Sequence, residues 1–402
     1  MATVQPGGSN TIYWLALSLT PGLGPTRGRK LVKRYGAIQD IFHASLTELE
    51  SQGVQAHSAQ SIVMGKSLEL AHEEYAKAVS SGVAILSKDD ANWPSSLGQI
   101  YDPPLLLYVR GNVEAVSQPG IAIIGTRLPT PYGIGMAERL ACDLAARGLV
   151  IFSGLARGVD AASHRGAIQG AKKGAGSTVA VFGTGVDVIY PKENQKIAQG
   201  ILESGGALVS EFALNTFPAP QNFPIRNRII SGLSLGVLVV EAAEHSGSRI
   251  TARCALEQSR ELFAVPGHVT SKNSWGPNTL IKQGAKLTAT WEDVWEELPA
   301  SIRQEVESRM GAAASENQPQ TGKMFPENGL AASERPDGKE KLSPGERKVL
   351  SILSAHESTH IDEIMEKLEG QLSSAEVFTV LFELELNSKI RQLPGKNFVK
   401  SI

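Results

Sequence analysis

The sequence predicts an α/β fold with a doubly wound parallel β-sheet, preceded by a small helical domain and followed by a winged-helix-like domain. Three observations predict the sheet. Six short apolar runs lie between residues 120 and 298, helical patterns alternate with them, and glycines or polar turns bound each run. Short apolar runs are typical of strands buried on both faces, and strand–helix alternation is typical of a doubly wound sheet.

The chain has 402 residues, enough for two or three domains. We expect a helical domain of SAM-like or helix–hairpin–helix type at residues 1–78 and the α/β domain at residues 79–299. Residues 300–341 are rich in Ala, Gly, Pro, Ser and Glu and show no clear apolar periodicity, so we expect a flexible linker there. Residues 342–402 then form the last domain.

The first elements are two short helices, expected at Tyr13–Leu19 and Thr26–Tyr35, with the turn Pro21–Pro25 between them. A glycine turn between two helices can hold a DNA phosphate, or it can simply be a tight corner. The sequence leaves both alternatives open. Several basic residues lie near this turn, namely Arg27, Arg29, Lys30, Lys33 and Arg34.

The sheet follows further along the chain, after two apolar stretches at Val83–Leu86 and Pro104–Val109. Helical patterns between its strands include Ala137–Ala146 and Asn194–Leu202. The six expected strands are Ile121–Ile124, Leu149–Phe152, Thr178–Phe182, Ala207–Val209, Gly236–Val240 and Leu262–Val265.

Glycines, small polar residues and arginines follow these strands, at the sheet edge where ligands of doubly wound folds bind. Backbone N–H groups in such turns, together with guanidinium groups, can bind anions. The sequence therefore predicts an anion-binding edge. Its candidate residues are Gly125, Thr126, Arg127, Ser153, Gly154, Arg157, Gly158, Phe223, Arg226, Asn227, Arg228, Ser246, Gly247 and Ser248.

The most informative stretch of this edge is Phe223–Leu233, where an aromatic–proline pair and two arginines precede an apolar helical pattern. Arginines at the start of a helix can clamp phosphate. An exposed Phe223 can stack on a base. We expect Arg226 and Arg228 to hold phosphate, whereas the sequence assigns no role to Asn227.

The charge distribution also points to an anionic ligand. The whole chain has a net charge of −2, but residues 120–290 contain 17 lysines and arginines against 11 acidic residues, a net charge of +6. A basic segment within a nearly neutral chain is typical of an anion-binding surface. The two cysteines form no CxxC or metal-ligand spacing, which fits a cytoplasmic protein, and no apolar stretch is long enough to span a membrane.

No pattern in the sequence indicates catalysis, a metal or a cofactor. Neither GxG segment completes a dinucleotide motif, and the glycine-rich turn at residues 173–178 lacks the lysine that directly precedes the Ser/Thr in a phosphate loop. Asp160 and His164 lie one helical turn apart, and we expect a helix cap and a packed histidine there. We expect Glu211 and Glu241 to hold arginines or loop N–H groups.

The last domain has the helix–helix–helix–hairpin order of a winged helix, with helices expected at Pro344–Ser354, His360–Leu368 and Ser373–Asn387. The hairpin is expected at Ile390–Leu393 and Asn397–Val399. From residue 341 to the end the net charge is −1, which suits a DNA groove poorly. We expect a protein–protein role for this domain.

The chain resembles the DNA-processing protein A family, DprA or Smf. The motifs that carry the resemblance follow one another in the family's order over residues 80–290. They are Gly125–Arg127, Ser153–Asp160 with His164, Tyr190-Pro191, Ser210-Glu211, Phe223–Leu233, Val240–Ala242, Ser246–Ser248, Val265–Gly267 and Gly276 to Ala285.

The resemblance implies an extended Rossmann domain and a cytoplasmic, dimeric protein without enzymatic activity. Such a protein binds and protects incoming single-stranded DNA and helps to load the RecA recombinase during natural transformation. The DNA is then expected along the edge that carries Arg127, Arg157, Phe223, Arg226 and Arg228. An alternative is a nucleotide-processing enzyme that uses the same phosphate site, but Glu241–Thr251 lacks the Pro-Gly-Gly turn of such enzymes.

Overall fold

The computed structural model describes residues 10–174, 176–244, 246–316, 344–353, 359–368, 372, 374–386, 389–393 and 397–400. These residues belong to two compact units, 1–320 and 321–402, which are described separately. Within the described ranges, no helix is long and apolar enough to cross a membrane.

The first unit is built on a nine-stranded sheet with the order β1-β2-β6-β5-β4-β3-β7-β8-β9. All neighbours from β6 to β9 are parallel, whereas β1 and β2 extend the sheet as antiparallel strands. All six strands predicted for the parallel region are present, which confirms the fold class. The strands are β1 Val83–Ser87, β2 Leu106–Gly111, β3 Gly120–Ile124, β4 Val150–Ser153, β5 Ser177–Val181, β6 Ala207–Ser210, β7 Gly236–Val239, β8 Glu261–Ala264 and β9 Lys286–Leu287.

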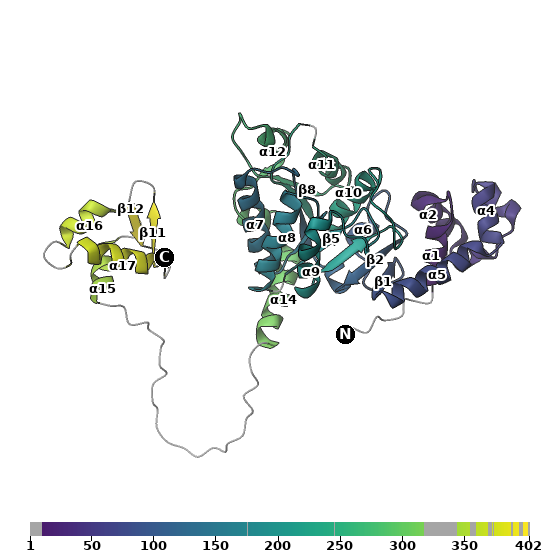
Figure 1. Cartoon of the computed structure of the whole chain (residues 1–402), viewed down its shortest axis with the longest axis horizontal. Coiled ribbons are helices and arrows are strands. Elements are labelled where there is room, and N and C mark those ends of the chain that lie inside the picture. The colour runs from purple at the N-terminus through teal and green to yellow at the C-terminus, as the bar shows by residue number, and fades with distance from the viewer. Residues whose placement is uncertain are drawn as a thin grey trace, which may run out of the picture. The chain divides into compact units, whose positions relative to one another are not determined.

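Both faces of the six predicted strands are buried, as their continuous apolar runs predict. In β3, Ala122 and Ile124 belong to the core on one face, and Ile121 and Ile123 belong to the core on the other. Side chains alternate because successive residues of a strand point to opposite faces. The first face is covered by α6 Ser95–Gly98, α10 Asn222–Leu233 and α11 Ser248–Glu257, and the second by α7 Pro131–Ala146, α8 Val159–Ala171 and α9 Gln195–Glu203 (Figure 1).

The N-terminal helices gather beside β1 and β2 (Figure 1), and their core includes Trp14 together with Ile85 and Tyr108 of these strands. The predicted domain boundary at residue 78 therefore falls inside a helix and inside one continuous core. In the predicted turn between the first two helices, Gly22 and Gly24 have positive φ. The helices are α1 Thr11–Leu19, α2 Gly24–Tyr35, α3 Leu46–Ser51, α4 Ala56–Val63 and α5 Lys66–Ser80, with the short 3-10 helix η1 Gln39–Phe42.

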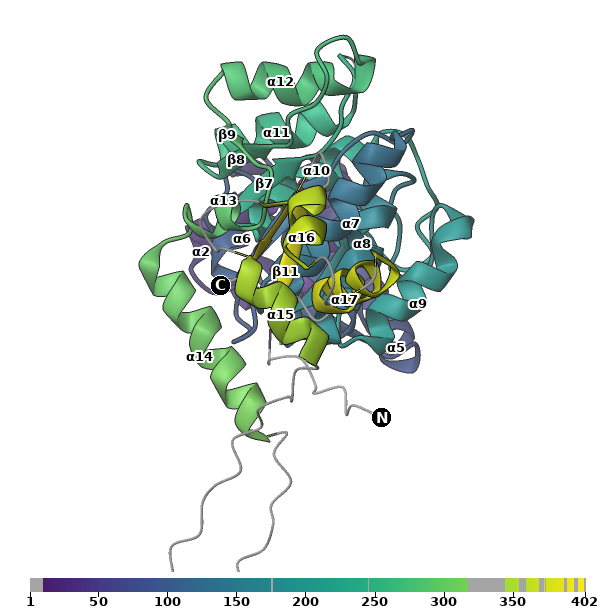
Figure 2. The ribbon, with the colours of Figure 1, turned by 90° about the vertical axis from the view of Figure 1, so that its left-hand side faces the viewer.

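The first part of the predicted linker is a helix, so that expectation is wrong for residues 300–316. Helix α14, Ala300–Glu316, follows α13, Glu292–Trp295, and is a single unbroken helix (Figure 2). Val306 is fully buried in the sheet core, and the Arg309 guanidinium donates to the Gly148 carbonyl at 3.2 Å. Ile302, Val306 and Met310 are spaced four residues apart, and such a stripe packs on one face of a helix. Residues 317–341 lie outside the described ranges.

The second unit has the predicted winged-helix order, with a short additional strand. Its three-stranded antiparallel sheet has the order β10-β12-β11. Val349, Ile364 and Leu384, one from each helix, meet in its core. The elements are α15 Pro344–Ile352, β10 Thr359–His360, α16 Ile361–Lys367, α17 Ser374–Leu386, β11 Ile390–Leu393 and β12 Asn397–Lys400.

Candidate nucleic-acid interface

A groove of about 970 Å³ runs along the carboxyl edge of the sheet. Gly154 and Arg157, on the loop after β4, line a small pocket beside it that shares Arg127 and Phe223 with the groove. Nine of the predicted site residues line the groove itself: Gly125, Thr126, Arg127, Phe223, Arg226, Asn227, Ser246, Gly247 and Ser248.

The loop after β3 presents Arg127 to solvent. Gly125 packs so closely that a Cβ there would lie 2.6 Å from Val159, and the Thr126 N–H donates to the Glu241 carbonyl at 2.6 Å. These contacts fix the backbone on both sides of the turn. The Arg127 guanidinium lies over the Phe223 ring, 6.0 Å from its centroid. No ion pair joins Arg127 to any residue in the described part of the chain, so its charge is available to a ligand.

Asp160 organises the loop after β4. Its carboxylate accepts hydrogen bonds from the N–H groups of Gly154 at 3.1 Å and Ala156 at 3.4 Å. The sequence predicts a helix cap at Asp160, and this is wrong, because α8 already begins at Val159 and the carboxylate points back to the preceding loop. Burial raises the pKa of Asp160, and the charge of Arg226 acts in the opposite direction.

The other predicted residues of this loop either support its backbone or form an ion pair. The Ser153 hydroxyl donates to the Ile123 carbonyl at 2.7 Å, in the core. Gly158 has a φ of +75°, and a Cβ there would lie 2.4 Å from the Thr126 carbonyl, so only glycine fits. Arg157 forms a two-pronged ion pair with Glu193 at the exposed surface. Exposed pairs of this kind contribute little stability, so a phosphate can displace Glu193 from Arg157.

Arg226 forms the floor of the groove, with only 5% of its surface exposed. Its guanidinium donates to the carbonyls of Gly154 and Val181, which ties α10 to β5 and to the loop after β4. A Cβ at Gly154 would lie 2.2 Å from this guanidinium. Burial lowers the pKa of Arg226 to about 10, which still leaves it charged at neutral pH. Arg226 is therefore a fixed positive charge beneath the groove.

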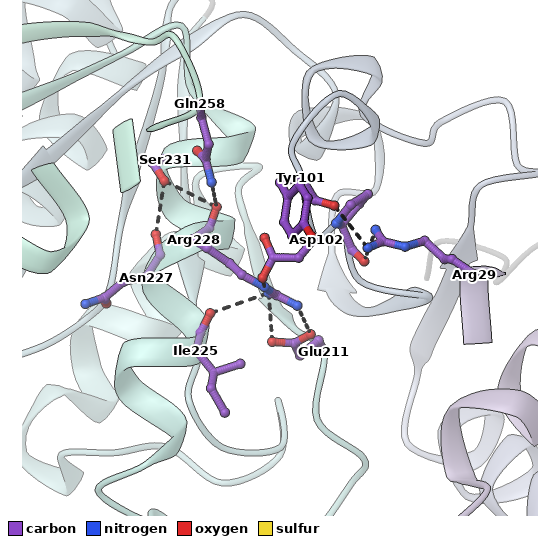
Figure 3. A network of polar contacts seen from close by, with 10 residues as sticks. Arg29, Tyr101, Asp102, Glu211, Ile225, Asn227, Arg228, Ser231 and Gln258 are labelled. Atoms are coloured by element: carbon purple, nitrogen blue, oxygen red, sulfur yellow. Dashed lines mark hydrogen bonds and ion pairs between the residues drawn. The ribbon is translucent and has the colours of Figure 1, made fainter. Parts of the chain in front are cut away.

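Arg228, the second predicted phosphate clamp, faces away from the groove, and this expectation is wrong. Figure 3 shows its guanidinium between Asp102 and Glu211. The distances are 2.9 Å to Asp102 and 3.0 and 2.7 Å to the two oxygens of Glu211. On the other side of the Asp102 loop, Arg29 of α2 donates to the carbonyls of Tyr101 and Pro103. Arg228 is thus an anchor that joins α10 to the sheet and to the loop that α2 holds.

The position of the helix start explains why Arg228 faces away from the groove. Helix α10 already begins at Asn222, before Phe223 and Pro224. A proline is tolerated in a first helical turn because its missing N–H would have no partner there. Both arginines therefore lie inside the helix, where their side chains point in different directions.

Aromatic side chains lie beside the free Arg127. The rings of Tyr190 and Phe223 are 5.7 Å apart, and Tyr190 is 45% exposed. Asn227, half-buried, also lines the groove, and its side-chain amide has no hydrogen bond to any described residue. A ligand in the groove thus meets two aromatic rings, a guanidinium and an unpaired amide.

The turn after β7 supplies hydroxyl groups. The Ser246 and Ser248 hydroxyls are 2.7 Å apart, and the Ser248 N–H donates to Ser246 at 3.4 Å. Gly247 between them is exposed, and a Cβ there would meet open space. This turn forms one wall of the groove at the start of α11.

Lys272 and Trp275 are among the groove residues that the sequence did not single out. They lie at the start of η4, Lys272–Ser274, and of α12, Trp275–Lys282. Both are exposed, with Trp275 at 39%. The sequence signal for these two residues is a lysine and a tryptophan spaced three residues apart after the last long strand, β8.

The acidic residues and the histidine near the edge are held by structural contacts. Glu211 binds Arg228, and Glu241 accepts from the Thr130 N–H at 2.8 Å and its hydroxyl at 2.6 Å, as expected for both. His164 is fully buried and its Nδ1 contacts the Thr178 hydroxyl at 2.7 Å, which confirms a packed histidine. Among the described residues, no group of three His, Cys, Asp or Glu side chains could hold a metal ion.

Comparisons with known proteins agree with this geometry. A family profile described as DNA recombination-mediator protein A matches residues 84–299, and a DprA winged helix domain profile matches residues 333–396. The chain is 40% identical over 312 residues to Protein Smf of Escherichia coli, covering 77% of this chain and 76% of that protein. It is 44% identical over 219 residues to DNA processing protein DprA of Bacillus subtilis, covering 54% and 72%.

The fold has a counterpart among solved structures. The X-ray structure of DNA processing protein A from Streptococcus pneumoniae superimposes with a TM-score of 0.62 at 33% sequence identity, covering 73% of this chain and 99% of that one. The family profile spans the whole parallel region of the sheet, including every loop that lines the groove. The chain therefore belongs to the DNA recombination-mediator protein A family, DprA or Smf.

Proposed function

We propose that the groove binds single-stranded DNA and that the chain acts as a recombination mediator through it. One observation carries the proposal: the unpaired Arg127 lies over the ring of Phe223, which lies against Tyr190. A cation beside aromatic rings suits a nucleic acid strand, because the cation attracts phosphate and each ring can stack on a base of any sequence.

The fixed charge of Arg226 strengthens this attraction without contacting a phosphate itself. It lies beneath the groove with little access to water, so water screens its field less than that of an exposed arginine, and the nearby Asp160 carboxyl offsets part of this field. Arg127 and Lys272 then make the direct phosphate contacts at the surface. We expect binding to depend little on sequence and to weaken steeply with salt.

We further propose that the chain is not an enzyme. The buried carboxylates nearest the groove, Asp160 and Glu241, are occupied by loop N–H groups and a hydroxyl. We infer the remaining roles from the family: a homodimer in the cytoplasm that protects incoming DNA and helps to load RecA during natural transformation. Light scattering tests the dimer, and RecA filament formation on DNA covered by single-strand-binding protein tests the loading.

The test of DNA binding compares Arg127→Ala with Arg253→Ala. Arg253 is exposed on α11 and does not line the groove, and its one ion pair among the described residues is with Glu257 of the same helix, so its variant removes the same charge outside the groove. A charged hydrogen bond is worth about 1.5–3 kcal/mol, so we expect Arg127→Ala to weaken binding of a single-stranded oligonucleotide at least tenfold. The slope of log affinity against log salt should fall by about 0.7 for each lost phosphate contact.

Two results would contradict the proposal. Binding by wild type that does not respond to salt would exclude phosphate contacts, and equal affinity of the two variants would place the DNA elsewhere. The alternative function, nucleotide processing, is tested by incubating the protein with nucleoside monophosphates and measuring released base. Release by wild type that Arg127→Ala abolishes would favour that alternative.

A further inference from the structure

We propose that Trp275 and Lys272 form a second nucleotide-binding subsite in the groove, separate from the subsite at Tyr190 and Phe223. The inference rests on the proposed function, since it assigns where a second part of the same strand binds. Trp275 is 39% exposed and lines the groove, and Lys272 is exposed beside it. Within the described part of the chain, Lys272 has no ion pair or hydrogen bond through its side chain, so its charge is free for a phosphate.

The backbone at Trp275 is held firmly, which suits a stacking platform. The next residue, Gly276, donates its N–H to the Ala242 carbonyl at 2.8 Å, and a Cβ at Gly276 would lie 2.5 Å from that oxygen. The Arg249 guanidinium lies over the Trp275 ring, 5.2 Å from its centroid, and also donates to the Glu244 carbonyl. The ring is thus fixed at its backbone and supported by Arg249, while part of its surface faces the groove.

The two aromatic subsites lie on segments that leave the sheet at different strands. Tyr190 follows β5 and Trp275 follows β8, and these strands are four places apart in the sheet. Adjacent strands are spaced about 4.8 Å, so the two loops arise about 19 Å apart. Stacked nucleotides of one strand rise only about 3.4 Å each. We therefore expect a strand that contacts both subsites to span several nucleotides.

The size and charge of the groove agree with this arrangement. Its volume of about 970 Å³ is near the upper limit of pockets that hold drug-sized ligands, which is about 1,000 Å³. The groove is lined by all four residues, whereas the small side pocket beside it is lined by Tyr190 and Phe223 but not by Trp275 or Lys272. The exposed carboxylate of Glu244 also lines the groove, and its repulsion should direct phosphates toward Lys272.

The experiment measures affinity for oligo(dT) of increasing length, from a trinucleotide upward, with wild type, Trp275→Ala, Trp275→Phe and a control, Tyr101→Ala. Tyr101 is 92% exposed and lies outside the groove, so its variant removes an aromatic ring without changing either subsite. Stacking on an aromatic side chain is worth about 1–3 kcal/mol, so we expect Trp275→Ala to weaken binding of long oligonucleotides at least fivefold. The shortest oligonucleotides should bind all four proteins equally, because they fill only the Tyr190–Phe223 subsite.

Trp275→Phe keeps a ring and should restore most of the affinity, which separates stacking from a folding defect. Oligonucleotide-dependent quenching of tryptophan fluorescence should disappear in Trp275→Phe, because Trp275 is the groove's tryptophan. If Trp275→Ala binds long oligonucleotides as Tyr101→Ala does, the second subsite is refuted while the proposed function stands. If wild type binds no single strand at any length, the proposed function fails, and the subsite fails with it.

Discussion

Replacing Arg228 by Ala tests whether this residue is an anchor or a phosphate clamp. Only 9% of its side chain is exposed to solvent, and its guanidinium has Asp102 on one edge and Glu211 on the other. Glu211 is itself largely buried, with 11% of its side chain exposed. The variant therefore leaves a buried carboxylate without its partner.

The expected loss of stability follows from this burial. Removing one partner of a buried ion pair typically costs about 3–5 kcal/mol, because the remaining charge is neither hydrated nor paired. Asp102 contributes less to the loss, since 40% of its side chain is exposed and water can replace Arg228 there. The first unit has about 300 described residues, for which 1 kcal/mol corresponds to about 1.5 °C at an unfolding entropy of about 2.1 cal/mol/K per residue, so the melting temperature should fall by about 5–8 °C.

The assay combines urea unfolding with oligonucleotide binding, the latter at a temperature where the variant is folded. We expect the unfolding midpoint to fall and the affinity of the folded protein to stay within about twofold of wild type. The double variant Arg228→Leu with Glu211→Leu should recover part of the lost stability, because it removes both buried charges together. A stable Arg228→Ala protein that binds DNA at least tenfold more weakly would refute the anchor role and restore the phosphate clamp.

Two further predictions concern stability. Burial lowers the pKa of His164 to about 3, below the ordinary 6.5, so the unfolded chain binds a proton first as the pH falls. The free energy of unfolding should thus fall by about 1.4 kcal/mol between pH 7.5 and pH 5.5 because of this histidine. In His164→Gln, the free energy of unfolding should depend less on pH by the same amount. An unchanged pH dependence would contradict a buried neutral histidine. Val306→Ala should destabilise the first unit by about 2 kcal/mol in urea unfolding, because α14 packs on the sheet core; no change would mean that α14 does not contribute to this unit.

The sheet could be predicted from the sequence because each predicted strand has a recognisable local pattern of residues. Each of the six predicted strands is largely buried and forms a short apolar run in the sequence, and glycines bound the runs where loops approach other backbone closely. Helix α14 lacked such a clear signal. Its three apolar residues are spaced four apart among charged and small residues, and the composition of the surrounding segment resembled a linker more than a helix.

The site could be predicted as a set of loops but not as individual side-chain roles. Which loops meet at the sheet edge follows from the alternation of strands and helices, and Arg127 and Phe223 do meet there. Whether an arginine is free depends on partners distant in sequence. Asp102 lies 126 residues from Arg228, and Gly154 lies 72 residues from Arg226. Nothing local to the Phe223–Leu233 run reveals either contact.

Once the helix start is known, the helical periodicity of that run nevertheless predicts which of its side chains line the groove. From a start at Asn222, the residues Phe223, Arg226, Asn227 and Ile230 fall at positions i, i+3, i+4 and i+7 of one helical face, and these residues line the groove. Arg228 is two residues beyond Arg226, a rotation of about 200° on a helix with 3.6 residues per turn, which turns it to the opposite side. One helix thus presents a ring, a buried charge and an amide to the groove while its other face is anchored by an ion pair. The two arginines of the motif look equivalent in sequence, but the helical repeat gives them different roles.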